Sequence, residues 1–342
     1  MVTPMADGGL LSGLPRQRLA QLPTPLHLLP RLSAALGGPE LWVKRDDLTG
    51  LGGGGNKVRK LELLLADARQ HGAQTIVTTG APQSNHARQT AAAAAHCGLR
   101  CVLALSGASA GRDEGNLLLD RLFGAEVRWC GDRPAATVMQ EVLAEEASVG
   151  RVAYLIPAGG STAVGAAAYA AALAELLQQA AMSGVTFSHI VLASGSGGTQ
   201  AGLVAGAVAC SFTGAILGIS VGASAEALAP LVHELAALTA GLLRVRSGVP
   251  AQRVLVDDRW AAPGYGVVTA AEREALLLLA RSEGLLLDPV YTARAMAALI
   301  AMVRQGELKS GERVLFWHTG GAPALPAYAD ALLSPGLPSS AA

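Results

Sequence analysis

The sequence predicts an α/β protein made of two open, twisted parallel-sheet domains with a cleft between them. Short apolar segments alternate with helix-forming segments along most of the chain, a pattern typical of parallel sheets covered by helices on both faces. The 342 residues supply too many strand segments for one small sheet. Polar and glycine-rich stretches follow several of these segments, at the strand ends where open sheets bind ligands. A single (β/α)₈ barrel is the alternative fold.

The composition favours a protein that acts on a small molecule. Hydrophobic residues make up 51% of the chain, charged residues only 15%, and the formal net charge is zero. This balance argues against nucleic acid or an anionic membrane as the main partner. The uncharged stretch 191–225 is interrupted by glycine-rich segments, so it predicts strand, loop, short helix and strand rather than a membrane span. The four cysteines show no zinc or disulfide spacing, which predicts reduced core residues, no metal and a cytoplasmic location.

The elements follow one another in a regular order. Prolines at 23, 25 and 30 predict an extended lead-in before a strand at 41–43. The charged stretch 44–50 and the glycines at 52–55 come next, and a helix is expected from Asn56 to about Gly72. Further strands are expected at 75–79, 101–105, 126–130, 152–156, 189–193, 215–221, 253–256 and 313–317. Helices are expected at 84–97, 116–123, 135–148, from 162 onward, at 270–283 and at 290–305. We expect a small domain at 54–167 and a large domain formed by 1–53 and 168–342.

Lys57 is the strongest candidate for covalent chemistry. The chain has only four lysines, Lys44, Lys57, Lys60 and Lys309, and Lys57 alone stands where a glycine turn enters a helix. A lysine amine becomes a nucleophile or proton carrier once its surroundings lower its pKa. The order Gly-Asn-Lys-Val excludes a nucleotide P-loop, which needs Gly-Lys-Ser/Thr. A solvated lysine in a first helical turn is the alternative.

Three further stretches follow strand segments. Glycines and hydroxyls at 194–199, ahead of a helix, have the properties of a phosphate site made of neutral donors, or of a plain strand–helix turn. Ser84 and Asn85 open a helix either as caps or as ligand-binding groups. His86 and His318 are candidate acids or bases, although no Ser/His/Asp pattern supports hydrolysis.

Tyr265 and Tyr291 stand out because aromatic residues are only 4% of the chain. Each is expected either to pack in the core or to stack on a flat cofactor.

Together these motifs resemble the fold-type II pyridoxal-phosphate enzymes, from about Pro23 to Tyr328. The resemblance is to the branch of D-cysteine desulfhydrases, L-cysteate sulfo-lyases and 1-aminocyclopropane-1-carboxylate (ACC) deaminases. It is carried by Lys-Arg-Asp-Asp at 44–47, Gly-Gly-Asn-Lys-x-Arg-Lys-Leu-Glu at 54–62, Gln-Ser-Asn-His-x-Arg-Gln-Thr at 83–90, Ser-Gly-Ser-Gly-Gly-Thr at 194–199, Leu-Asp-Pro-Val-Tyr-Thr at 287–292 and His-Thr-Gly-Gly at 318–321.

The resemblance implies roles for individual residues. Lys57 would hold pyridoxal phosphate covalently and move the substrate's α-proton, Asn85 would bond the ring oxygen, and Thr319 would face the pyridine nitrogen. The phosphate would lie on Ser194, Gly195, Ser196, Gly197, Gly198 and Thr199. Catalytic residues would be Lys57, Ser84, Tyr265 and Tyr291, with Tyr291 against the ring, and substrate contacts would come from Ser84, Asn85, His86, Tyr265 and Thr292.

The resemblance also implies a reaction, the α,β-elimination of a β-sulfur amino acid. D-cysteine, giving pyruvate, sulfide and ammonia, is the first choice, and L-cysteate, giving sulfite, is the alternative. ACC is disfavoured because this chain has Thr292 and Thr319 where ACC deaminases carry Glu and Leu. A non-catalytic amino-acid-binding protein is the candidate from another class. Family members are commonly homodimers, so a homodimer is expected.

Overall fold

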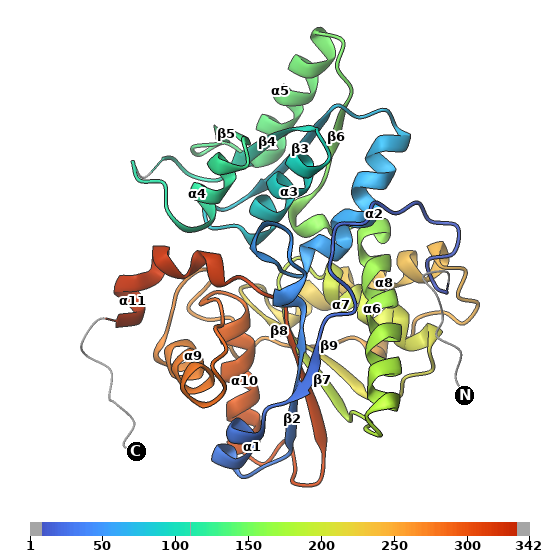
Figure 1. The fold of residues 1–342 in the computed structure, drawn as a ribbon, viewed down its shortest axis with the longest axis vertical. Coiled ribbons are helices and arrows are strands. Elements are labelled where there is room, and N and C mark those ends of the chain that lie inside the picture. Colours follow the sequence, from blue (N-terminus) through green and yellow to red (C-terminus); the bar gives the residue numbers. More distant parts are fainter. Residues whose placement is uncertain (1–8, 110, 334–342) are drawn as a thin grey trace.

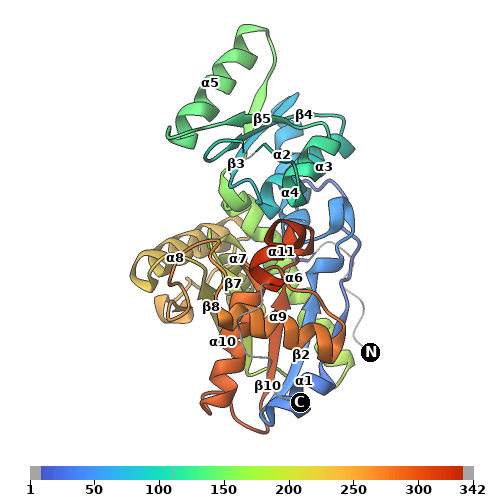
Figure 2. The same ribbon diagram turned by 90° about the vertical axis from the view of Figure 1, so that its left-hand side faces the viewer.

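The computed structural model describes residues 9–109 and 111–333, which form two separate open sheets, the smaller above the larger (Figures 1 and 2). The predicted α/β class with two parallel sheets is confirmed, and the single closed barrel is excluded. No helix in the described ranges is long and apolar enough to cross a bilayer.

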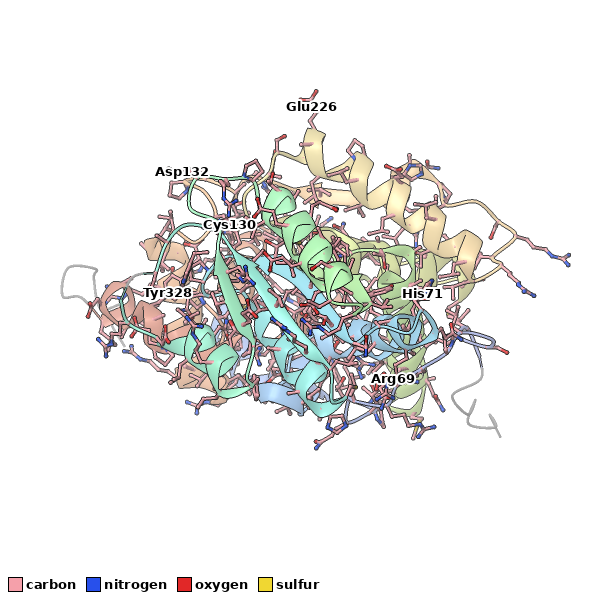
Figure 3. All side chains as sticks on the ribbon, turned by 90° about the horizontal axis from the view of Figure 1, so that it is seen from above. Arg69, His71, Cys130, Asp132, Glu226 and Tyr328 are labelled. Atoms are coloured by element: carbon pink, nitrogen blue, oxygen red, sulfur yellow. The ribbon has the colours of Figure 1, made fainter. Side chains whose placement is uncertain are left out.

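The smaller sheet is entirely parallel, with strand order β5-β4-β3-β6. Its strands are β3 (Thr75–Gly80), β4 (Arg100–Leu105), β5 (Glu126–Trp129) and β6 (Ala153–Leu155). One face is covered by α2 (Lys57–Gln70), α3 (Asn85–His96) and α4 (Gly115–Leu122), and the other by α5 (Ala135–Ser148). Seen from above, α5 lies across these strands, and the end of α2, marked by Arg69 and His71, lies at the rim opposite Tyr328 (Figure 3). Helix α2 therefore begins deep in the molecule and ends at its surface.

The larger sheet has strand order β1-β2-β10-β7-β8-β9. Its strands are β1 (Leu26–Leu28), β2 (Glu40–Arg45), β7 (His189–Ser194), β8 (Ala215–Ser220), β9 (Leu255–Asp257) and β10 (Arg313–His318). Helices α1 (Pro30–Leu36), α9 (Ala270–Glu283) and α10 (Thr292–Arg304) cover one face, and α6 (Ala163–Met182), α7 (Gly198–Ala209) and α8 (Ala225–Leu242) cover the other. The central strand β10 shows why both faces are buried, since Val314 and Phe316 enter one core while Leu315 and Trp317 enter the other.

Shorter elements complete the chain. The 3₁₀ turns are η1 (Asp46–Leu48), η2 (Leu51–Gly53), η3 (Ala158–Gly160), η4 (Ala251–Arg253) and η5 (Ala322–Tyr328), and the last described helix is α11 (Ala329–Leu333). The four-stranded sheet falls within 54–167, and every strand of the six-stranded sheet falls outside it. The bounds themselves stay a prediction, and α6 runs across the expected boundary at residue 168.

Three expectations are wrong in part, two at the N-terminal region and one for the cysteines. Pro30 does not prolong an extended segment but begins α1, a position where its missing N–H costs no hydrogen bond. Strand β1 pairs antiparallel with β2 at the sheet edge, so the larger sheet is not purely parallel. All four cysteines are free, as expected, but Cys97 and Cys210 are only partly buried.

A buried ion network joins α2 to the larger sheet. Arg59 of α2 contacts Asp46 at 2.9 Å and Glu175 of α6 at 2.9 Å, and Lys44 of β2 contacts Glu175 at 2.5 Å. Asp46 also accepts hydrogen bonds from Thr24, Tyr169 and Trp317. The arginine lowers the pKa of the Asp46 carboxyl against the opposing effect of its burial. The Lys-Arg-Asp-Asp stretch therefore supports the helix that carries Lys57.

Candidate active site

A cavity of about 510 Å³ lies between the two sheets. It opens at the carboxyl ends of β3, β7, β8 and β10, where Gly80, Ser194, Val221 and Thr319 line it. The cavity brings together all predicted site residues except Thr292 and His318: Lys57, Ser84, Asn85, His86, Ser194, Gly195, Ser196, Gly197, Gly198, Thr199, Tyr265, Tyr291 and Thr319. The cavity therefore lies at the strand ends, where the sequence predicted the site, and ligand binding by these residues stays a prediction.

Lys57 is the first residue of α2, and its amine is positioned by the glycine turn before it. Its backbone N–H donates to Gln89 Oε1 at 2.9 Å, which satisfies one of the free donors at the helix start. Burial lowers the pKa of Lys57 to about 8, and the carboxylate of Asp288 opposes part of that shift. An appreciable fraction of this amine is therefore neutral near pH 7 to 8 and able to attack a carbonyl.

Asp288 was not identified from the sequence, although it is the carboxylate that acts on Lys57. Its side chain is fully buried and accepts hydrogen bonds from the backbone N–H groups of Val290, Tyr291 and Thr292, at 2.8 to 3.1 Å. Burial raises the pKa of Asp288, and these hydrogen bonds oppose the rise. Asp288 therefore fixes the turn that presents Tyr291 to the cavity.

Thr292 does not line the cavity, which corrects its expected contact with substrate. Its side chain is fully buried, and its hydroxyl donates to Asp288 Oδ1 at 2.7 Å. The hydroxyl is occupied in holding the start of α10, so Thr292 acts on the site through Asp288.

The 194–199 loop has the geometry of an anion site. Gly197 precedes α7 with a φ of +77°, which favours glycine, and turns the chain so that the helix N-terminus faces the cavity. Ser196 and Ser161 hydroxyls lie 2.8 Å apart, and Asn56 Nδ2 donates to Thr199 Oγ1 at 3.0 Å. The Ser194 hydroxyl is buried and has no hydrogen-bond partner among the described residues. These donors and the helix end suit a bound phosphate.

Lys60 corrects the expectation that this loop contains only neutral donors. It is fully buried, and its ammonium donates to Gly159 O at 3.1 Å. A β-carbon at Gly198 would lie 2.8 Å from Lys60 Nζ, so the ammonium lies directly against the loop. Burial, with a smaller contribution from Lys57, holds the pKa of Lys60 well below its usual value. A phosphate dianion beside it would favour the charged form.

The start of α3 contributes three predicted residues. Ser84 caps the helix by accepting from Ala87 N–H at 3.1 Å, which leaves its hydroxyl hydrogen free to donate into the cavity. Asn85 Oδ1 accepts from Asn116 Nδ2 at 2.9 Å. His86 Nε2 lies 2.8 Å from Thr78 Oγ1, and burial holds the pKa of His86 well below its usual value. A neutral His86 is a weak candidate for a general acid.

Tyr265 and Tyr291 contact each other in the wall of the cavity. Their hydroxyl oxygens lie 2.7 Å apart, and their rings meet edge to face with centroids 5.7 Å apart. A β-carbon at Gly195 would lie 3.3 Å from Tyr291 Cε1, which places Tyr291 beside the 194–199 loop. Both tyrosines therefore line the cavity and contact each other, Tyr265 is exposed rather than packed in the core, and stacking on a cofactor stays a prediction.

His318 is not part of the cavity lining. It is buried, with Nε2 3.0 Å from Leu286 O and Nδ1 accepting from Gly320 N–H at 3.2 Å. It shapes the turn after β10 and so places Thr319, which does line the cavity.

Comparisons with known proteins agree on one family. Residues 17–320 match the family model described as pyridoxal-phosphate dependent enzyme. The chain is 45% identical over 325 residues to a D-cysteine desulfhydrase of Klebsiella pneumoniae subsp. pneumoniae, which covers 93% of this chain and 97% of that protein. It is also similar to a solved structure described as an ACC deaminase homologue, with a TM-score of 0.87, 40% identity, and coverage of 95% of this chain and 97% of that one.

Proposed function

Since the chain belongs to the family of pyridoxal-phosphate dependent enzymes, we propose that it removes sulfide from D-cysteine by α,β-elimination. The products are pyruvate, sulfide and ammonia, and one water is consumed. The observation that carries this proposal is a cavity containing Lys57 and the 194–199 loop, in a chain 45% identical to a D-cysteine desulfhydrase.

The cavity residues fit the cofactor. The Ser194 hydroxyl, which has no hydrogen-bond partner within the described part of the chain, suits the phosphate, as do Lys60 and the N-terminus of α7. Lys57 supplies an amine with a lowered pKa. Asn85 and Thr319 line the same cavity and would hold the ring oxygen and ring nitrogen. When bound, pyridoxal phosphate withdraws electrons from the α-carbon of an attached amino acid.

The chain's own groups then act on the substrate. The hydroxyl of Ser84 and the N-terminus of α3 bind its carboxylate, because both present donors to the cavity. The neutral amine of Lys57 takes the α-proton, the Cα–H electron pair forms the new double bond, and the Cβ–S bond breaks with its pair leaving on sulfur. The Tyr265–Tyr291 pair limits the space beside the reacting carbon.

Replacement of Lys57 by Ala tests the catalytic assignment. We expect pyruvate release from D-cysteine to fall about a thousandfold or more, because both the covalent attachment and the proton transfer are lost. Pyruvate is measured with a coupled assay, and the visible absorbance of the bound cofactor is recorded in parallel. Full turnover in Lys57→Ala would refute the assignment.

A side-by-side substrate assay tests the reaction itself. D-cysteine, L-cysteine, L-cysteate and ACC are supplied at equal concentration, and pyruvate, sulfide and sulfite are measured. We expect pyruvate with sulfide from D-cysteine. Sulfite from L-cysteate as the faster reaction would replace the proposal with an L-cysteate sulfo-lyase, and turnover of ACC alone would replace it with an ACC deaminase. Amino-acid binding without any turnover would favour a non-catalytic binding protein.

We propose that the enzyme works in the cytoplasm as a homodimer, on the resemblance to its family. Light scattering from the purified holoenzyme measures its mass against the 34.7 kDa of one chain.

A further inference from the structure

Asn116 lies outside the cavity lining but contacts one of its members. It is the second residue of α4, is fully buried, and donates from Nδ2 to Asn85 Oδ1 at 2.9 Å. The same Nδ2 donates to the backbone carbonyl oxygen of Gln83 at 2.8 Å. Gln83 in turn holds Asn116 in place, because Gln83 Oε1 accepts from Asn116 N–H at 2.8 Å.

The backbone carbonyl of Gln83 decides which way both amides point. A carbonyl oxygen only accepts hydrogen bonds, so Asn116 must turn its NH₂ group toward Gln83. The second hydrogen of that NH₂ group is donated to the Asn85 side chain, so the Asn85 atom that accepts it must be Oδ1. The NH₂ group of Asn85 is thereby turned away from Asn116 and toward Gly321, where a β-carbon would lie only 2.7 Å from Asn85 Nδ2.

We propose that Asn116 is a positioning residue that fixes Asn85 with its NH₂ group as a donor to the cofactor's ring oxygen. Without this contact the Asn85 amide can rotate by half a turn and present its own oxygen to another oxygen. The proposal rests on the placement of the cofactor against Asn85. It does not depend on which amino acid is the substrate, because cofactor binding alone tests it.

The experiment measures cofactor binding to the apoprotein by absorbance titration. Asn116→Leu keeps the volume of the side chain and removes its donors, and we expect the dissociation constant of pyridoxal phosphate to rise about tenfold. Thr90→Val is the matched control, because Thr90 is buried on α3, the helix of Asn85, and its hydroxyl has no partner among the described residues. That control is expected to stay within about twofold of the parent.

A double-variant cycle separates positioning from simple packing. If Asn116 acts through Asn85, adding Asn116→Leu to Asn85→Ala changes the dissociation constant by less than about twofold. An effect of Asn116→Leu as large in the Asn85→Ala background as in the parent overturns the proposal, as does an Asn116→Leu variant that binds like Thr90→Val. If Asn116→Leu does not fold, Asn116→Ser takes its place, and failure of both to fold shows a structural residue and also overturns the proposal.

Discussion

Lys57 and Lys60 lie one turn apart on α2, and burial lowers the pKa of both ammonium groups. Their surroundings nevertheless differ, since Asp288 faces the first and a glycine loop faces the second. Lys57, near the Asp288 carboxylate, keeps a pKa of about 8. Lys60 lies against the loop, where a bound anion would favour its charged form. Two chemically identical side chains therefore have different surroundings, which suit the proposed roles of Lys57 toward a carbonyl and of Lys60 toward a phosphate.

The lowered pKa of Lys57 predicts how the rate at which the apoprotein binds an aldehyde depends on pH. Only the neutral amine attacks, and with a pKa of about 8 its fraction rises nearly tenfold between pH 6 and 7 and levels off above about 8. A lysine at the ordinary value of 10.5 would still be rising at pH 9. The rate of pyridoxal binding, followed by absorbance, measures this pH dependence. Pyridoxal is used because it lacks a phosphate, whose own titration would alter the profile. A rate that climbs steadily to pH 10 would contradict it.

The substitution Lys60→Met is expected to lower the affinity for the cofactor and to raise the stability of the apoprotein. The affinity for pyridoxal phosphate should fall about tenfold or more, because a charged donor beside the phosphate loop is lost. The apoprotein should become more stable to urea, because burial lowers the pKa of Lys60 on folding and so costs folding free energy, a cost that methionine does not carry. Pyridoxal, which lacks the phosphate, should bind as it does to the parent. Lys309→Met, on an exposed turn, is the control; equal weakening for both aldehydes would speak against a contact with phosphate.

Lys57 was predicted from the sequence, whereas Lys60, Asp288 and Asn116 were not. Each of these three contacts or influences a residue that lies far from it along the chain. Lys57 stands at a glycine–helix junction that can be read locally. Lys60 stands beside Glu62, which suggests an ion pair, yet Glu62 pairs with Arg16 while Lys60 reaches Gly159. Partners so far apart in sequence leave no local pattern.

At the scale of the element, the loop before α7 depends on the absence of side chains. Gly198→Ala would place a β-carbon 2.4 Å from Ser161 Oγ and 2.8 Å from Lys60 Nζ, so either the loop or the side chains of Ser161 and Lys60 must shift. We expect a loss of about 1–3 kcal/mol in stability and a strong loss of cofactor affinity. Gly241→Ala, in the last turn of α8 with open space around it, should instead be neutral or stabilise by up to about 1 kcal/mol. Urea unfolding and absorbance titration measure both, and equal behaviour of the two variants would contradict the expected contact.

Most helices and strands were predictable because their hydrophobic periodicity is local. Helix α5 matches its expected range, and the other named elements fall within a few residues of theirs. The failures lie at the N-terminal edge, where prolines dominate. A proline fixes φ equally well for an extended segment and for a first helical turn, so Pro30 alone does not separate the two.

At the scale of the whole molecule, the ion network under α2 joins segments from three parts of the chain. Arg59→Met would leave Asp46 buried without its guanidinium partner, although Thr24, Tyr169 and Trp317 still donate to it. We expect a loss of about 3–5 kcal/mol in unfolding free energy. Arg133→Met removes an exposed pair with Glu141 and should cost less than about 1 kcal/mol. Urea unfolding compares the two, and similar losses would mean that burial of the network contributes little.

The position of β10 also bears on how the protein is made. This strand comes from residues 313–318 but lies between β2 and β7, so it is the last of the described strands to leave the ribosome and stands near the middle of its sheet. Until it arrives, β2 and β7 each present an open edge of unpaired amides and carbonyls. A nascent chain that stops before residue 313 is therefore prone to aggregate, and we expect chaperones to bind it most strongly at that stage of synthesis.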